Sequence, residues 1–91
     1  MHNTQTLNTM EQFKIEVTDT SVFGRFLSIK ALENEQYQIY NEQQERIATI
    51  EIDHDDRQHY RQSLDCKVGL PLLNSIRDSI LQHQEQELAM R

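Results

Sequence analysis

Apolar and polar side chains alternate one by one along several stretches of this chain, which is the pattern of strands that bury one face of a sheet. The clearest pair of such stretches is 36–40 and 46–52, separated by the short polar segment 41–45. Two alternating runs joined by a short polar gap predict a β-hairpin. The earlier run 13–17 alternates in the same way and predicts a further strand.

The segment 22–32 allows two interpretations. As a helix it would be capped by Ser21, with Val22, Phe26 and Ile29 forming an apolar stripe. As a strand it would place alternate residues on opposite faces, with Leu27, Ile29 and Ala31 on one and Phe26, Ser28, Lys30 and Leu32 on the other. The strand is favoured because Phe and Ile suit a sheet, Gly24 weakens a helix start, and no capping glycine follows.

A helical pattern replaces the alternation near the C-terminus. Pro71 suits the first turn of a helix, and Leu73, Ile76 and Ile80 then recur at helical spacing opposite a polar face. This spacing predicts an amphipathic helix over 71–84, with fraying beyond it because the acidic residues near its end oppose the helix dipole.

These elements predict a two-layer α+β fold, a four-stranded antiparallel meander (β-β-β-β-α) with one C-terminal amphipathic helix packed on one face. Residues 53–63 are expected to form a loop, with room for a short edge strand around Tyr60. A single domain is expected over residues 11–91, after a flexible N-terminal extension over 1–10. Patterned sequence begins at Met10, which suggests the hypothesis that Met10 is the true start.

Composition limits the classes of function. The chain has 91 residues, 36% of them hydrophobic, and a net charge of −6. A chain of this size has no room for a second domain or a cofactor-binding α/β domain. The acidic balance disfavours nucleic acid as a partner. A single cysteine, Cys66, suits a reducing compartment, and neither a signal peptide nor a membrane span is evident. We expect a cytoplasmic protein with no membrane or nucleic-acid partner.

The densest group of potential ligands lies at 53–59. Asp53, His54, Asp55 and His59 are the residue types that bind zinc, manganese or iron. Their spacing matches neither an EF-hand loop nor a zinc-protease helix, so a solvated loop is favoured and no metal or cofactor is expected. Cys66 beside Lys67 suggests a reactive thiolate, although an isolated cysteine more often packs as a small hydrophobe.

One helix covers only one face of a sheet, so the other face is a candidate interface. In the assigned registers it carries Phe26, Leu32, Tyr40 and Ile47, and Leu88 and Met90 at the end of the helix have no other role. An exposed apolar patch often marks a partner surface, whereas single exposed apolar residues are ordinary. The predicted interface residues are Phe26, Tyr40, Ile47, Leu88 and Met90.

The segment 33–56 contains eight acidic residues and one basic residue, Arg46, which predicts an acidic lobe at one end of the sheet. The chain has the general look of small soluble bacterial proteins, and no stretch carries a family motif. The leading hypothesis is a non-catalytic interaction or self-association module, expected to form a homodimer or to bind another protein. Two alternatives are a metal- or thiol-dependent activity within 53–66 and an acidic regulator or inhibitor of a basic protein.

Overall fold

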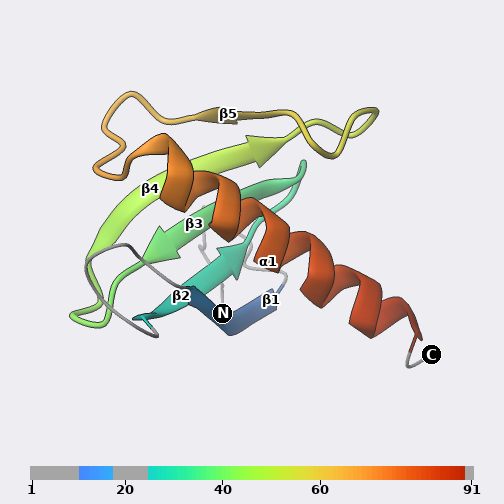
Figure 1. Ribbon diagram of the computed structural model, residues 1–91, viewed down its shortest axis with the longest axis horizontal. Helices are drawn as coiled ribbons and strands as arrows, with labels where there is room; N and C mark the ends of the chain where they lie inside the picture. Colours follow the sequence, from blue (N-terminus) through green and yellow to red (C-terminus); the bar gives the residue numbers. More distant parts are fainter. Residues whose placement is uncertain (1–10, 18–24, 90–91) are drawn as a thin grey trace, which may run out of the picture.

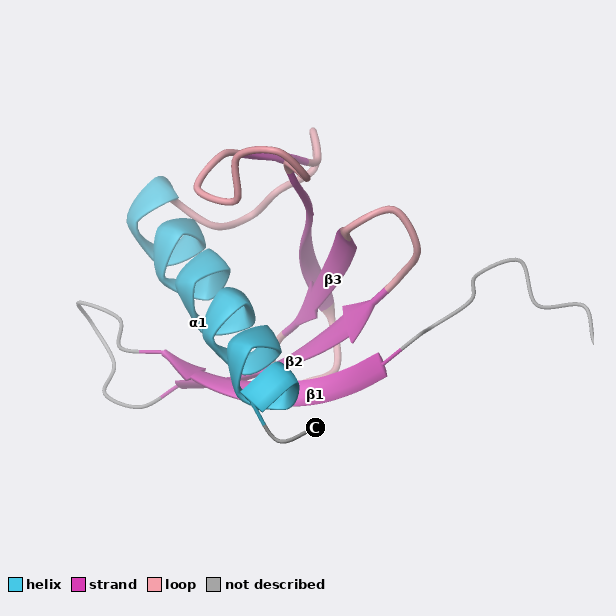
Figure 2. Ribbon diagram, turned by 90° about the vertical axis from the view of Figure 1, so that its right-hand side faces the viewer, coloured by secondary structure: helices cyan, strands magenta, loops and turns pink. Residues whose placement is uncertain are grey.

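The computed structural model describes residues 11–17 and 25–89, with side chains described up to Gln86. Five antiparallel strands lie in the order in which they follow one another along the chain, and one helix crosses a single face of their sheet (Figures 1 and 2). The elements are β1 (Glu11–Val17), β2 (Arg25–Ala31), β3 (Gln36–Tyr40), β4 (Arg46–Ile52), β5 (Tyr60–Gln62) and α1 (Leu70–Ala89). This architecture confirms the α+β class. The hypotheses on residues 1–10 lie outside the described residues.

Within the segment 22–32 the structure shows a strand over Arg25–Ala31, as favoured, since these residues pair with β1 and the last four of them also pair with β3. The number of strands was wrong, since the sheet has five strands rather than four. The extra strand is β5, which lies where the sequence allowed for a short edge strand around Tyr60, and its residues pair with Ile50–Ile52. A three-residue strand at a sheet edge is too short to show an alternating pattern, and residues 61 and 62 are both exposed and polar. Its backbone pairing is therefore what defines it.

The inner face of the sheet forms one apolar core with the helix. Consecutive strands contribute residues that are Cα partners across the sheet, such as Phe13 with Ile29 and Ile29 with Ile39. The buried members of this core are Ile15, Val17, Leu27, Ile29, Tyr37, Ile39, Ala48, Ile50, Ile52, Leu73, Ile76 and Ile80. The alternation in the strands and the helical spacing after Pro71 therefore place their apolar residues as predicted.

The helix begins one residue earlier than predicted and ends five residues later. The amide of Leu73 donates to the carbonyl of Gly69 at 3.0 Å, which forms the first turn around Pro71. The helix continues to Ala89, past residue 84, where fraying was expected to begin. Acidic residues near a helix C-terminus cost only about 0.3–1 kcal/mol each, which is too little to end a helix whose earlier turns are anchored in a core. Although α1 is 20 residues long, it is too polar to cross a bilayer, and the described part of the chain has no other helix that could.

The loop between β3 and β4 is built around Asn41. Its side-chain oxygen accepts hydrogen bonds from the amides of Gln43 and Glu45, each at 2.9 Å. This tight turn places Gln44 in the left-handed region, with a φ of 67°. A residue with a Cβ is strained there, whereas glycine adopts this conformation freely.

Replacing Gln44 by glycine should therefore stabilise the protein by about 0.5–1 kcal/mol, because relief of the strain outweighs the extra freedom that glycine has in the unfolded chain. Urea denaturation measures the change. The matched control is Gln43→Gly, at an exposed neighbour whose φ is not positive. We expect that control to be neutral or destabilising. Equal effects of the two substitutions would contradict the prediction.

Candidate interaction surface

The sheet face opposite α1 is the candidate surface, and we call it the open face. It consists of the side chains that point away from the core on the four longer strands: Gln12, Lys14 and Glu16 from β1, Phe26, Ser28 and Lys30 from β2, Gln36, Gln38 and Tyr40 from β3, and Arg46, Thr49 and Glu51 from β4. They share this face because side chains alternate across a strand and these positions are Cα partners from one strand to the next. No helix lies on this face in residues 11–17 and 25–89 (Figure 2).

Phe26 is the most prominent apolar side chain of the open face, with 49% of its surface exposed. A hollow beside it is lined by Lys14, Phe26, Ser28, Glu42 and Gln44. Aromatic side chains are enriched among the residues that contribute most to protein contacts, so Phe26 is the best apolar candidate on this face.

Tyr40 is half-buried on the open face and is held by its neighbours. Its hydroxyl donates to Oε1 of Gln38 at 3.2 Å, and Nζ of Lys30 lies 4.7 Å from the centre of its ring. Ser28 is 8% exposed, because it lies between Lys14 and Tyr40, its Cα partners on the adjacent strands. The centre of the open face is therefore an ordered mixture of aromatic and cationic groups.

The other predicted interface residues contribute less to this surface. Ile47 is half-buried and packs against the core, next to an irregularity in the pairing of β3 with β4. Leu32 is half-buried just after the end of β2. Leu88 lies in the last turn of α1, whose final turns extend beyond the sheet in Figure 1. The side chain of Leu88 and the whole of Met90 lie outside the described part of the chain.

The acidic residues of 33–56 are divided between the two ends of the sheet. The turns of a meander alternate between its ends, so Glu42 and Glu45 lie opposite the end that carries the other acidic residues, at 33–35 and 51–56. Basic residues also offset the charge of that larger group. Nη1 of Arg57 donates to Oε1 of Glu35 at 2.6 Å, and Nη2 of Arg61 donates to Oε1 of Glu51 at 3.2 Å. The predicted acidic lobe is therefore smaller and less charged than expected.

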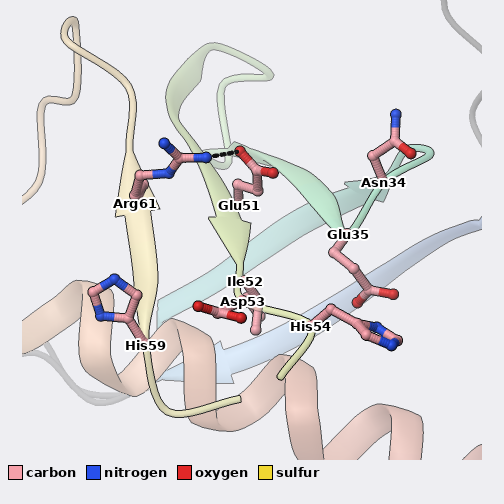
Figure 3. A pocket seen from close by; sticks show the side chains of 8 residues that line it. All are labelled: Asn34, Glu35, Glu51, Ile52, Asp53, His54, His59 and Arg61. Carbon is pink, nitrogen blue, oxygen red and sulfur yellow. Dashed lines mark hydrogen bonds and ion pairs between the residues drawn. The ribbon is translucent and has the colours of Figure 1, made fainter. Parts of the chain in front are cut away.

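The predicted metal candidates line a hollow at this acidic end, but their side chains do not converge. Figure 3 shows His54 and His59 on opposite sides of Asp53. The Asp53 carboxylate accepts hydrogen bonds from the amides of Asp55 at 2.8 Å and Asp56 at 3.4 Å, and these bonds lower its pKa. Nowhere in the described part of the chain do three His, Cys, Asp or Glu side chains gather as metal ligands. The role of Asp53 seen here is to shape the turn between β4 and β5.

Cys66 lies between β5 and α1 and is half-buried. Its thiol donates to the carbonyl of Val68 at 3.4 Å, and its side chain packs against the core. This placement favours the interpretation of Cys66 as a small packed hydrophobe.

A polar cluster that the sequence did not reveal joins the sheet, the β4–β5 loop and the helix. Arg57 donates from Nη1 to Glu35 and from Nη2 to Oε1 of Gln84, both at 2.6 Å, and Nε2 of Gln84 donates to the hydroxyl of Tyr37. We call Glu35, Tyr37, Arg57 and Gln84 the latch. Its members come from three separate stretches of the sequence, Glu35 with Tyr37, Arg57 and Gln84, and polar residues at such distances leave no periodic signal.

Two further contacts fasten the same loop to α1. The hydroxyl of Tyr60 donates to Oδ1 of Asn74 at 2.8 Å, and Nη1 of Arg77 donates to the carbonyl of Gln58 at 2.9 Å. The polar groups at this end therefore hold the loop against the helix, which leaves the open face as the better candidate for contact with other molecules.

Comparison with protein-family models, with curated proteins and with solved structures found no match to this chain.

Proposed function

We propose that this protein is a non-catalytic interaction module whose open face contacts a protein, either a second copy of the chain or another protein. The observation that carries the proposal is the half-exposed ring of Phe26, beside a hollow and on the same sheet face as the pair of Tyr40 and Lys30. Aromatic anchors surrounded by polar and charged side chains are the usual composition of a protein contact surface.

The arrangement of the reactive groups supports this proposal over catalysis. The Asp53 carboxylate is engaged by backbone amides, the two histidines beside it point apart, and Cys66 packs against the core. A metal- or thiol-dependent activity within 53–66 is therefore the less favoured alternative. Elemental analysis of protein purified without chelator tests it, and a stoichiometric metal would support it.

The alternative of an acidic regulator has one supporting observation. Glu33, Asp55 and Asp56 remain exposed at the larger acidic end, so a basic partner would find negative charge there. Binding through this end would weaken steeply as salt rises, because exposed charges are screened. Binding through Phe26 and Tyr40 would depend on salt only weakly.

The open face is tested by substituting its anchor. We expect Phe26→Asp to weaken partner binding at least about tenfold, because a central aromatic anchor commonly contributes 2 kcal/mol or more. The partner is first identified by co-purification from the native host, and its affinity is then measured by calorimetry with purified proteins. Native mass spectrometry tests a second copy as the partner.

The matched control is Leu64→Asp, because Leu64 is fully exposed and lies outside the open face. Circular dichroism confirms that each variant is folded. Equal binding by the Phe26→Asp and Leu64→Asp variants would contradict the proposal, and so would a wild-type protein that is monomeric and has no protein partner.

A further inference from the structure

The outer edge of β1 is a long strand edge with no partner strand among residues 11–17 and 25–89. β1 has seven residues and is the first strand in the sheet order, whereas the opposite edge is formed by the three residues of β5. A long strand edge presents unpaired amide and carbonyl groups, and it can pair with another strand.

The backbone hydrogen bonds elsewhere in the sheet determine which residues of β1 offer those groups. Leu32 donates to the carbonyl of Gln36 at 2.8 Å, so the even-numbered residues of β2 turn their backbone groups toward β3. The odd-numbered residues of β2 then turn toward β1, where their Cα partners are also odd-numbered. It follows that Gln12, Lys14 and Glu16 direct their amides and carbonyls toward the outer edge.

These three outward residues carry charges that complement one another in an antiparallel copy. An antiparallel pair centred on Ile15 places Lys14 of each copy opposite Glu16 of the other, so two pairs of opposite charge form. The same arrangement places Phe13 opposite Val17 on the core side, where Phe13 is half-buried and has area left to cover. Opposite charges that face each other across a strand pair are stabilising.

Neighbouring symmetric registers lack this complementarity. A pair centred on Lys14 sets the two Lys14 side chains against each other, and like charges directly opposite are destabilising. A pair centred on Phe13 sets Lys14 opposite Gln12 and gives it no charged partner. The self-complementary spacing of Lys14 and Glu16 therefore selects one register.

We propose that two copies of this chain pair antiparallel through the outer edges of β1, about a two-fold axis at Ile15. The two sheets then form one continuous sheet, with both helices on the same side. This inference goes beyond the proposed function, because the copies contact each other through a strand edge and leave the open face available to another protein.

The pairing would bring the apolar anchors of the two copies into one surface. Phe26 is the Cα partner of Glu16, and Ser28 is the Cα partner of both Lys14 and Tyr40. In the pairing centred on Ile15, Glu16 of one copy lies opposite Lys14 of the other. A line of neighbouring side chains then crosses the open face, from Phe26 and Glu16 of one copy to Lys14, Ser28 and Tyr40 of the other. The two-fold axis repeats this row, so Phe26 and Tyr40 of both copies flank the junction.

Charge exchange tests the register. We expect Lys14→Glu alone and Glu16→Lys alone each to raise the dimer dissociation constant at least about tenfold, because both attractive pairs become repulsive. We expect the double variant Lys14→Glu/Glu16→Lys to restore the wild-type constant, since it exchanges the charges and keeps their complementarity. Sedimentation equilibrium at low and high salt measures the constants. Both side chains are exposed, and circular dichroism checks that each variant is folded.

Failure of this inference and failure of the proposed function give different results. A wild-type monomer from micromolar to millimolar concentration overturns the pairing, as does a dimer that both single variants leave unchanged or that the double variant does not restore. Tyr40→Glu, two strands away, should leave the dimer intact while it weakens binding to the open face. A dimer lost in Tyr40→Glu but kept in Lys14→Glu overturns the β1 pairing and supports self-association through the open face.

Discussion

Replacing Ile76 by alanine is expected to lower the free energy of unfolding by about 3–4 kcal/mol, because it removes three carbon atoms from a closely packed core and leaves a cavity. Ile76 is 0% exposed and lies between Leu73 and Ile80 on the stripe with which α1 contacts the sheet. A chain of this length is expected to have a total stability of only about 5–14 kcal/mol. This one substitution should therefore remove a large share of the stability.

Urea denaturation followed by circular dichroism measures this loss. The slope of the transition should stay the same while its midpoint falls, which separates lost stability from a change in cooperativity. Ser79→Ala, at a half-exposed position on the same helix, is the control and should change the stability by less than about 0.5 kcal/mol. A loss below about 1 kcal/mol for Ile76→Ala would contradict the packing of α1 on the sheet described above.

Tyr37 is the residue at which the core and the latch meet, and its replacement by alanine should cost about 3–5 kcal/mol. It is 3% exposed, and its hydroxyl accepts a hydrogen bond from Nε2 of Gln84. Tyr37→Phe keeps the ring and removes only that hydroxyl, so it should cost about 1–2 kcal/mol. The difference between the two variants, measured by urea denaturation, separates packing from hydrogen bonding. Equal losses would mean that the ring contributes nothing to the core.

The same residue predicts a loss of stability at alkaline pH. Burial, and after it the negative charge of Glu35, raises the pKa of Tyr37 above its ordinary value of 10.0. The unfolded chain therefore loses the tyrosine proton at a lower pH than the folded protein does. The contribution of the Tyr37 proton to the free energy of unfolding is fully present below pH 10.0. It is lost as the pH rises from there through the higher pKa of Tyr37 in the folded state.

Tyr37→Phe should reduce this alkaline loss, whereas Tyr40→Phe serves as the matched control. Denaturation midpoints measured on both sides of the ordinary tyrosine pKa check the sign. An alkaline loss that is the same in wild type and Tyr37→Phe would show that Tyr37 does not contribute to it. Tyr60 has a raised pKa for the same first reason, burial, so part of the loss should remain.

Local patterns in the sequence predicted most of the fold. The strands β1, β3 and β4 and the stripe of α1 follow from periodicities that extend over at least five residues, and the strand at 25–31 follows from its Phe and Ile content with Gly24 before it. β5 was anticipated only as an optional short edge strand around Tyr60 and was left out of the four-stranded meander, because a strand of three residues carries no period. Its position comes from backbone pairing with β4 and from the turn at Asp53, and neither is visible in residue types alone.

The candidate surface was predicted in part, for a similar reason. The alternation of side chains along their strands predicted that Phe26 and Tyr40 point away from the helix, and both lie on the open face. The same alternation predicted that Ile47 lies on that face. An irregularity in the pairing of β3 with β4 lies beside Ile47, and its side chain packs against the core. The latch was not predicted, because the partners of Arg57 lie 22 and 27 residues away and depend on the completed fold.

The order of the elements has a consequence for synthesis on the ribosome. Each strand pairs with the next one along the chain, so each hairpin can close within about 1–10 μs once its residues are free. The helix that covers their apolar side follows all five strands in the sequence. At roughly 5–20 residues per second, α1 and the connection before it take about 1–5 s to be made. Until α1 has been made, the apolar side of the sheet, which includes Ile29, Ile39 and Ile50, lacks the helix that covers it in the folded protein.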